Sequence, residues 1–233
     1  MTAKPPLFSI IIAYRAGEDG AQFLPRALDC LLRQSCQDFE IVLCHADPLP
    51  PEVDPARYPR LLLCPLEPGA DSEAAMRQTG LIRATGEFVI HMKPEDLLYD
   101  FALERIVRSR ATPRSRILIE PKTGMFLGTT AELASGEEAD VLIFSVLRIG
   151  VECDGTHFWM NARYDRRHAM LLTGRPALPQ LMECMQVAVR RSLWLAQGGW
   201  YDPSPEGHAA MHCRFIGENW ARCVPAVLGE HWG

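Results

Sequence analysis

The chain lacks several features that would assign it to a particular class of protein. It has no run approaching the roughly 18 apolar residues that a membrane span requires. The apolar run near its start is short, follows two prolines and lacks a small-residue cleavage site, so we expect a cytoplasmic protein. A net charge of -5 argues against a broad basic face for nucleic acid or anionic lipid. The absence of a G-x-S-x-G motif argues against a hydrolase built on a serine nucleophile.

The eight cysteines include no C-x-x-C pair. Most of them lie inside apolar stretches, such as E-I-V-L-C ending at Cys44 and R-L-L-L-C ending at Cys64. This distribution favours reduced, buried cysteines that serve as small hydrophobic side chains. A disulfide framework or a zinc site remains the alternative.

The N-terminal half alternates between strand and helix patterns. Apolar runs predict buried strands at residues 8–13, 39–44, 60–64 and 88–92, and the first of these runs is rich in β-branched residues. Helical spacing predicts helices at residues 22–34 and 71–83, the second capped by Asp71 and ended by Gly86, and a third after the turn at 93–96. Such alternation favours an α/β protein with a largely parallel sheet. In these sheets ligands bind beyond the carboxyl ends of the strands, at the loops 14–20, 45–55 and 93–96.

The C-terminal half is less regular. Its patterns predict strands at 117–120, 141–146 and 158–160, helices at 176–184, 192–196 and 205–215, and a turn at Gly198–Gly199. The sequence shows no internal repeat, and no obvious linker separates the two halves. We therefore expect a single domain over residues 1–233.

The turn after the fourth predicted strand reads K-P-E-D, from Lys93 to Asp96. An acidic turn at the end of a buried strand is typical of a metal site, a phosphate site or an acid–base carboxylate. Here Lys93 stands in front of the two acids, Glu95 and Asp96.

Four stretches, in order along the chain, resemble the inverting GT-A glycosyltransferases of family 2. F-S-I-I-I-A-Y-R and then F-L-P-R-A-L-D-C-L-L-R-Q-S-C-Q-D-F-E-I-V-L resemble the opening of that family. A-M-R-Q-T-G-L-I-R-A-T-G-E-F-V-I resembles the family's A-R-N-x-G-x-x-x-A-x-G-E-Y-I, and R-R-S-L-W-L-A-Q-G-G-W-Y-D resembles its acceptor-side segment. The resemblance runs from Pro6 to about Arg214. It implies a GT-A domain with a mixed, mainly parallel sheet flanked by helices, a nucleotide-sugar-binding half at about 6–110 and an acceptor-side half at about 111–233.

The chain departs from the family pattern where the family binds its metal, Mn²⁺ or Mg²⁺. The family's D-x-D triplet is Lys93-Pro94-Glu95 here, followed by Asp96, and the asparagine of A-R-N is Gln78. At about 4 Å and an effective dielectric near 20, a unit-charge pair is worth roughly 4 kcal/mol, and a divalent ion would feel about twice that repulsion from Lys93. An ordinary metal site is therefore doubtful.

Three interpretations of this turn stay open. In the first, Lys93 replaces the metal and pairs directly with the donor diphosphate, assisted by Arg77 or Arg83. In the second, Lys93 is a surface group paired with Glu95 or Asp96. In the third, Glu95 and Asp96 still hold a metal.

The resemblance also implies nucleotide contacts and a catalytic base. Tyr14 and Arg15 end the first strand, where members of the family contact the nucleotide. Alternatively, these residues only pack against neighbouring side chains, as residues at strand ends often do. The family's D-D-G-S acids are replaced by His45 and Ala46. Asp47 follows them, either as a contact to the nucleobase or ribose or as an ordinary loop residue.

Aligning on Arg214 places His208 at the family's catalytic Asp, with Glu206 close enough to be the equivalent instead. An imidazole with an ordinary pKa near 6.5 can accept a proton at neutral pH. His208 and His212, with Glu206, also have a spacing that could bind a transition metal, or the two histidines are ordinary helix residues. Trp159, Trp194 and Trp200 either stack on a sugar or pack in the core.

The function implied by the resemblance is transfer of a sugar from a nucleotide donor to a saccharide or lipid-linked acceptor. Inversion at the anomeric carbon and a role in bacterial cell-surface polysaccharide synthesis would be typical of such proteins. Peripheral membrane or multi-enzyme association is possible for these relatives, and we expect no nucleic-acid partner. The alternative is a non-catalytic relative that binds nucleotides or assists the assembly of an active transferase.

Overall fold

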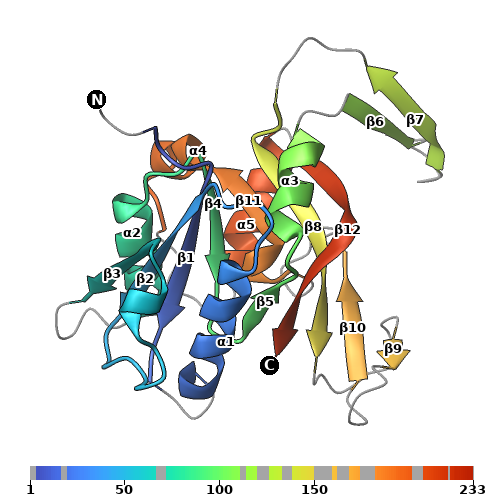
Figure 1. The fold of residues 1–233 in the computed structure, drawn as a ribbon. Coiled ribbons are helices and arrows are strands. Elements are labelled where there is room, and N and C mark those ends of the chain that lie inside the picture. Colours follow the sequence, from blue (N-terminus) through green and yellow to red (C-terminus); the bar gives the residue numbers. More distant parts are fainter. Residues whose placement is uncertain are drawn as a thin grey trace.

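The computed structural model describes residues 4–16, 20–66, 72–110, 114–119, 126–132, 138–149, 159–161, 168–173, 182–200, 207–219 and 221–232. Within them, five α-helices and a long curled sheet form an α/β fold (Figure 1). No helix in these ranges combines the length and the apolar character that crossing a bilayer requires.

Four parallel strands form one half of the main sheet. They are β1 (Phe8–Tyr14), β2 (Phe39–His45), β3 (Leu61–Pro65) and β4 (Phe88–Met92), in the spatial order β3-β2-β1-β4. β1 and β4 are buried along their whole length, because helices cover both faces of the sheet. These four strands confirm the four that the apolar runs predict.

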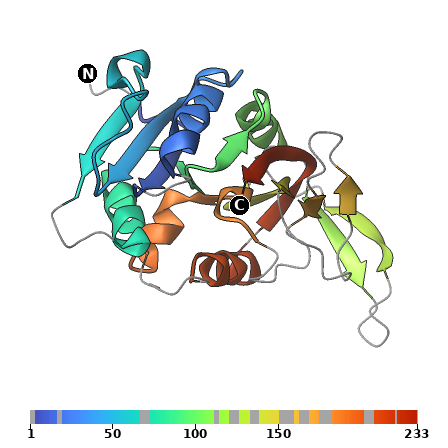
Figure 2. The ribbon, with the colours of Figure 1, turned by 90° about the horizontal axis from the view of Figure 1, so that it is seen from below.

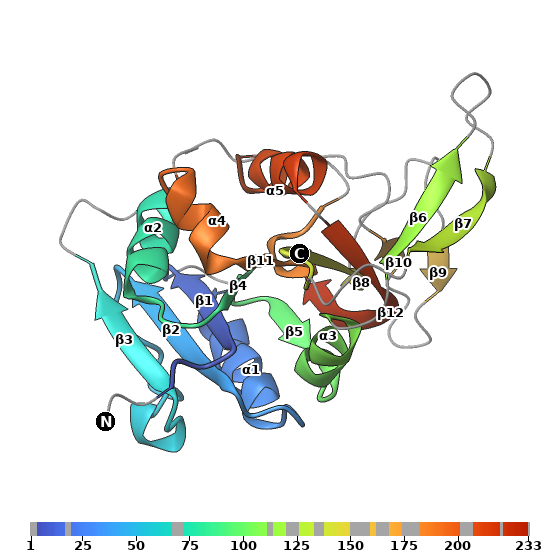
Figure 3. The same cartoon turned by 90° about the horizontal axis from the view of Figure 1, so that it is seen from above.

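Helices divide between the two faces of this sheet. α1 (Gly20–Leu32) and α3 (Ala102–Arg110) lie on one face, and α2 (Glu73–Arg83), α4 (Arg191–Ala196) and α5 (Gly207–Glu218) lie on the other (Figure 3). The alternation of β1 side chains builds one core on each face: Ile10 packs with Leu28 of α1, and Ile11 packs with Leu81 of α2.

The second half of the sheet is mixed. It contains β5 (Asp96–Leu98), β8 (Val141–Ile149), β9 (Trp159–Asn161), β10 (His168–Leu172), β11 (Val187–Arg190) and β12 (Ala221–Trp232). β11 lies antiparallel between β4 and β8, and joins the two halves. β12 runs parallel to β8 and ends antiparallel to β5, so the C-terminal strand reaches the turn at 93–96. β6 (Arg114–Ile119) and β7 (Phe126–Glu132) form a separate hairpin that projects from the body (Figure 1).

The structure corrects the predicted helix ends. The N-cap of α2 is Ser72, whose hydroxyl oxygen accepts a hydrogen bond from the Ala75 N–H at 3.1 Å; the predicted cap, Asp71, lies outside the described residues. α2 ends at Arg83, before Gly86. Gly86 is instead a close-approach position, because a Cβ there would lie 2.6 Å from the backbone of β1.

The later elements were harder to predict. Strands β8 and β9 and helices α4 and α5 correspond to predicted elements, and Gly198–Gly199 forms the predicted turn with positive φ angles. Residues 176–181 of the predicted helix lie outside the described residues, and Cys184–Gln186 form a short 3₁₀ helix (η3). β6 overlaps the strand predicted at 117–120, whereas strands β5, β7, β10, β11 and β12 were not predicted. The single-domain organisation stays a prediction.

Candidate functional site

Three parallel strands bring the predicted site residues to one edge of the sheet. Because β1, β2 and β4 are parallel, their carboxyl ends meet there, and Tyr14 of β1 lies directly beside His45 of β2. Lys93 follows β4 at the same edge. Figure 2 views the molecule from this side, which we call the carboxyl edge.

The loops after β1 and β2 are tied together. The Ala16 N–H donates a hydrogen bond to Asp47 Oδ2 at 2.7 Å, and His45 Nδ1 lies 3.0 Å from the Asp47 carbonyl oxygen. Tyr14 is buried, and burial together with the charge of Asp47 raises its pKa. Arg15, next to it, is exposed. The structure thus brings Tyr14, Arg15 and Asp47 together, and their contact with a nucleotide stays a prediction.

The carboxylate of Asp96 is fully engaged within the fold. Its Oδ2 accepts a hydrogen bond from the Lys93 N–H at 2.7 Å, and its Oδ1 lies 2.7 Å from His231 Nδ1. Asp96 is 1% exposed, and burial raises the pKa of its neighbour Glu95. In the described part of the chain no three His, Cys, Asp or Glu side chains gather closely enough to hold a metal ion. As these residues stand, Glu95 and Asp96 do not fit an ordinary metal site, because Asp96 is buried and no third such side chain joins them in the described part of the chain.

Sequence reasoning did not identify two further residues of this cluster. His231 comes from the end of β12, and its Nε2 lies 3.9 Å from Glu183 Oε2. Burial alone would lower the pKa of His231, but its hydrogen bond to Asp96 and the charges of Asp96 and Glu183 raise it. This contact depends on the pairing of β12 with β5, which links residues more than 130 positions apart, so no local sequence pattern indicates it.

Lys93 carries a positive charge that no described acid neutralises at contact distance. Its side chain is half-buried, and among the described residues its ammonium group forms neither a hydrogen bond nor an ion pair. Burial lowers the pKa of Lys93, but the proximity of Cys184, Glu183, Asp96 and Glu73 raises it overall. The geometry therefore does not support the interpretation of Lys93 as a surface group paired with Glu95 or Asp96.

Arg77 lies in the same electrostatic neighbourhood. It is fully buried on α2, and its Nε donates a hydrogen bond to Glu73 Oε1 at 2.9 Å. Its Nη1 is buried with no hydrogen-bond partner in the described part of the chain. Burial would lower the pKa of Arg77, but Cys184, Glu73 and Asp96 raise it. Cys184 itself is a neutral thiol at pH 7, because burial raises its pKa to about 12.

Aromatic rings close the space beside Arg77. Its guanidinium lies over the Trp200 ring at 4.9 Å, and Trp200 stacks on Trp194 at 5.1 Å. His91 and His212 contact both rings edge-on. Trp194 and Trp200 are buried, which confirms the core-packing alternative for these two. The side chain of Trp159 lies outside the described residues.

The predicted catalytic base is only partly placed. His208 lies in the first turn of α5, but its side chain lies outside the described residues, as does Glu206 altogether. His212, one turn later, is fully buried against the tryptophans. A metal role for His212 would therefore require a metal ion inside the core. A base role for His208 stays a prediction.

Gln78, the residue after Arg77 on α2, has a clear structural contact. Its Oε1 accepts a hydrogen bond from the Trp200 N–H at 2.6 Å. Gly199, with φ +86°, approaches it so closely that a Cβ would lie 2.2 Å from Gln78 Oε1. The turn Gly198–Gly199 therefore seats Trp200 beside α2.

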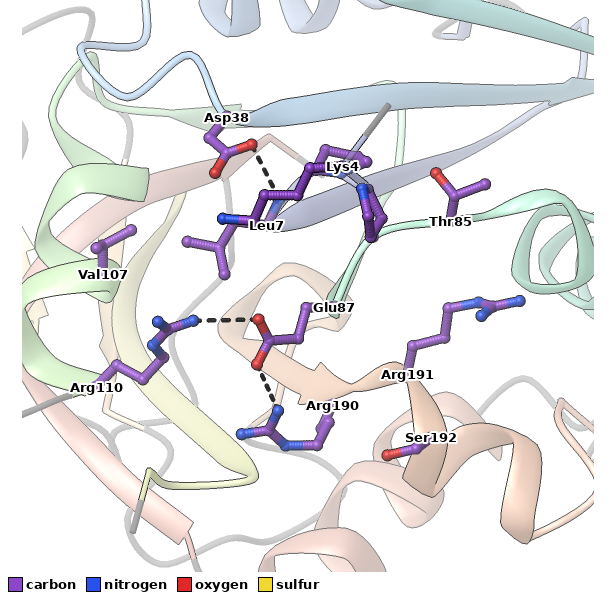
Figure 4. A pocket seen from close by; sticks show the side chains of 13 residues that line it. Lys4, Leu7, Asp38, Thr85, Glu87, Val107, Arg110, Arg190, Arg191 and Ser192 are labelled. Carbon is purple, nitrogen blue, oxygen red and sulfur yellow. Dashed lines mark hydrogen bonds and ion pairs between the residues drawn. The ribbon is translucent and has the colours of Figure 1, made fainter. Parts of the chain in front are cut away.

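The opposite edge of the same strands holds a cavity of ≈ 570 Å³ (Figure 4). In Figure 4, Arg110 and Arg190 both point toward Glu87. Arg110 also lies 3.0 Å from Glu138, and Arg190 lies 2.7 Å from Asp140. Arg191 lies apart from this network, and its Nε is buried with no hydrogen-bond partner in the described part of the chain.

No protein-family profile and no curated protein matches the sequence. The structure is similar to that of S. aureus TarS residues 1–349, with a TM-score of 0.59, 14% identity, and coverage of 97% of this chain and 60% of that one. The complex of the same TarS fragment with UDP-GlcNAc gives a TM-score of 0.58 at 14% identity, covering 97% and 58%. Mannosyltransferase PcManGT from Pyrobaculum calidifontis, in complex with GDP-Man and Mn²⁺, gives 0.53 at 15% identity, covering 99% and 57%.

These likenesses show the fold. The mixed, mainly parallel sheet flanked by helices is the GT-A-like α/β fold that the sequence segments predict. The chain spans about three fifths of the length of the solved structures that it matches.

Proposed function

We propose that the protein transfers a sugar from a nucleoside diphosphate donor, and that Lys93 and Arg77, rather than a metal ion, hold the donor diphosphate. One observation carries the proposal. At the carboxyl edge, the Lys93 ammonium has no ion pair with a described residue, and Arg77 Nη1 is a buried donor without a partner in the described part of the chain. Buried donors are rarely left unpaired, and an incoming anion would satisfy them.

The solved structures support the donor class. One similar structure contains UDP-GlcNAc and another contains GDP-Man with Mn²⁺. A diphosphate joins the nucleoside and the sugar in both ligands. The choice between them, and the family 2 assignment itself, belong to the proposal.

The metal-free part of the proposal rests on this chain's own residues. A divalent ion needs several ligands, and no group of three His, Cys, Asp or Glu side chains gathers at this turn in the described part of the chain. Lys93 stands where the first acid of a D-x-D triplet would be, and its charge would repel the ion. The same charge would balance the negative charge that develops on a leaving diphosphate.

The reaction needs one displacement. The acceptor hydroxyl oxygen forms a bond to the anomeric carbon while the bond from that carbon to the diphosphate oxygen breaks. The hydroxyl proton passes to a base, for which His208 and Glu206 are the candidates. A single displacement inverts the anomeric carbon. In this proposal Tyr14, Arg15 and Asp47 contact the nucleoside, and the acceptor is a saccharide or a lipid-linked sugar.

Calorimetric titration with UDP, GDP, CDP and dTDP, each with and without Mn²⁺, tests the proposal. We expect at least one nucleotide to bind without metal. Lys93→Ala should weaken that binding about 10- to 100-fold, the range of a lost charge-assisted hydrogen bond. Lys4→Ala is the matched control, because Lys4 lies at the opposite edge of the sheet.

Other outcomes have definite meanings. Binding only in the presence of Mn²⁺ would show that a metal site survives around Glu95 and would overturn the metal-free proposal. Failure of all four nucleotides to bind would overturn donor binding altogether. The protein would then be a non-catalytic relative that assists the assembly of an active transferase. Tight metal-free binding would justify an assay of sugar transfer.

A further inference from the structure

We infer that Trp200 is a positioning residue, which determines the edge of the Arg77 guanidinium that faces an anionic ligand. The inference rests on the proposed function, because the anion would be the diphosphate of the donor. It adds a residue of the C-terminal half to Lys93 and Arg77, the two cations that the N-terminal half contributes.

The guanidinium of Arg77 is held on two sides. Along one edge, Nε and Nη2 both donate hydrogen bonds to Glu73 Oε1. The guanidinium carbon, Cζ, lies over the Trp200 ring at 4.9 Å from its centroid. The remaining donor, Nη1, is buried with no hydrogen-bond partner in the described part of the chain. The two restraints thus leave one edge of a fully buried cation for a ligand.

Trp200 is itself fixed from several directions. Its N–H donates a hydrogen bond to Gln78, which is the residue after Arg77 on α2. Its ring is stacked on Trp194 with an interplanar angle of 19° and contacts His91 edge-on at 4.7 Å. Gly199 permits this approach through its positive φ and its missing Cβ. A ring held so firmly restricts the rotation of the guanidinium that it faces.

The contact also joins the two halves of the chain. Trp200 and Trp194 both contact His212 on α5, the helix whose first turn contains the candidate base His208. Arg77 belongs to the helix beside the proposed donor site. The aromatic cluster therefore connects α2, which carries Arg77, with α5, which carries the candidate base His208.

A double-mutant cycle on ligand affinity tests the inference. The affinities of UDP and of inorganic pyrophosphate are measured by calorimetry for Trp200→Leu, Trp200→Phe, Arg77→Lys and the double variants. We expect Trp200→Leu to weaken both ligands about 3- to 30-fold, and Trp200→Phe to weaken them less. In the Arg77→Lys background, Trp200→Leu should weaken the affinity by less than a further 2-fold. Lysine has no planar guanidinium for Trp200 to orient.

The control separates positioning from folding. Phe39→Leu alters another buried ring that lies under a guanidinium, that of Arg60 at 5.5 Å, at the start of β2. It should reduce the midpoint of urea unfolding and leave both affinities unchanged. The milder Trp200→Phe variant keeps the test valid if Trp200→Leu does not fold.

The outcomes distinguish this inference from the proposed function. Equal losses from Trp200→Leu in both backgrounds, or no loss, would overturn the inference alone while UDP still binds. Pyrophosphate binding that depends on Trp200 and Arg77, without binding of any nucleotide, would overturn the donor proposal alone. If wild-type protein binds neither ligand, both are wrong.

Discussion

The amino and carboxyl edges of the parallel strands both gather cationic side chains, and they use them differently. At the amino edge, Arg110 and Arg190 share Glu87 and Glu138, and Arg190 also pairs with Asp140. These contacts join the start of β4, the end of α3, the start of β8 and the end of β11. At the carboxyl edge acidic side chains lie near the cations, but some hydrogen-bond donors of those cations have no partner among the described residues.

This difference separates a structural cation from one that is available to a ligand. A guanidinium with a carboxylate at contact distance on each side has its donors occupied, so an added anion would compete with an existing pair. Lys93 is surrounded by acids that raise its pKa and keep it charged, and yet none of the described ones is at contact distance. An incomplete set of partners therefore distinguishes Lys93 from Arg110 and Arg190. Arg191 at the amino edge also has a buried Nε without a hydrogen-bond partner in the described part of the chain, so the comparison of the edges concerns Arg110 and Arg190.

Reversing the charge at Lys93 should produce the largest effect. Lys93→Asp replaces attraction for a diphosphate with repulsion, and we expect metal-free UDP binding to weaken about 100-fold or more. Calorimetric titration measures this loss. The corresponding reversal at the amino edge, Lys4→Asp, should leave UDP binding unchanged. Undiminished metal-free binding by Lys93→Asp would remove the distinction between the two edges.

The turn beside Arg77 should be sensitive to a single methyl group. Gly199→Ala places a Cβ 2.2 Å from Gln78 Oε1 at φ +86°, and we expect a loss of about 2–3 kcal/mol in the free energy of unfolding. Gly198→Ala has a similar φ of +85° but no atom within 4 Å, so it should cost only about 1 kcal/mol. Urea unfolding of both variants isolates the contribution of the close approach to Gln78. Equal losses would show that backbone strain alone accounts for the effect.

Removing a paired cation should affect stability rather than binding. Arg190→Ala removes the ion-pair partner of Asp140 and leaves Glu87 with Arg110 alone, and we expect a loss of about 1–2 kcal/mol in the free energy of unfolding. Its UDP affinity should equal that of the wild type. Arg33→Ala, whose ion pair with Asp100 is more than half exposed, should change the free energy of unfolding by less than about 0.5 kcal/mol. A loss of UDP binding in Arg190→Ala would contradict the structural assignment.

The smallest effect should be a pH dependence of stability. Because Asp96 and Glu183 raise the pKa of His231 above the unfolded value of about 6.5, folding takes up a proton. This stabilisation is present in full below about pH 6.5 and is lost as the pH rises through the raised folded-state pKa. His231→Gln, which keeps a hydrogen-bond donor for Asp96, should flatten that part of the profile. Urea unfolding from pH 6 to 9 measures it, and identical slopes in both proteins would contradict the assignment.

The sequence predicted the parallel half of the fold well, because that half has strong local signals. The β-branched runs of β1, β2 and β4 are buried on both faces, and each pattern depends only on neighbouring residues. The site at the ends of those strands was predictable for the same reason. Once the strands are parallel, Tyr14, Asp47 and Lys93 must come to one edge.

The antiparallel half was predicted less well, because its pairing is not a local property. β11 carries only four residues, and its place between β4 and β8 depends on strands that are distant in the chain. β12 contains Pro225 and Gly229, which weaken the strand pattern, and its register with β8 shifts at two places. Propensity and periodicity carry no information about such partners.

What the sequence by itself determined is which residues form the parallel strands and which side chains follow those strands at the carboxyl edge, including Lys93 in front of Glu95 and Asp96. What only the tertiary structure decided is which charges are already satisfied. His231 engages Asp96, and Trp200 covers Arg77, from positions more than 120 residues further along the chain. Hydrogen bonds and ring contacts act over a few ångströms, so they are set by how strands and helices pack and not by their spacing in the sequence.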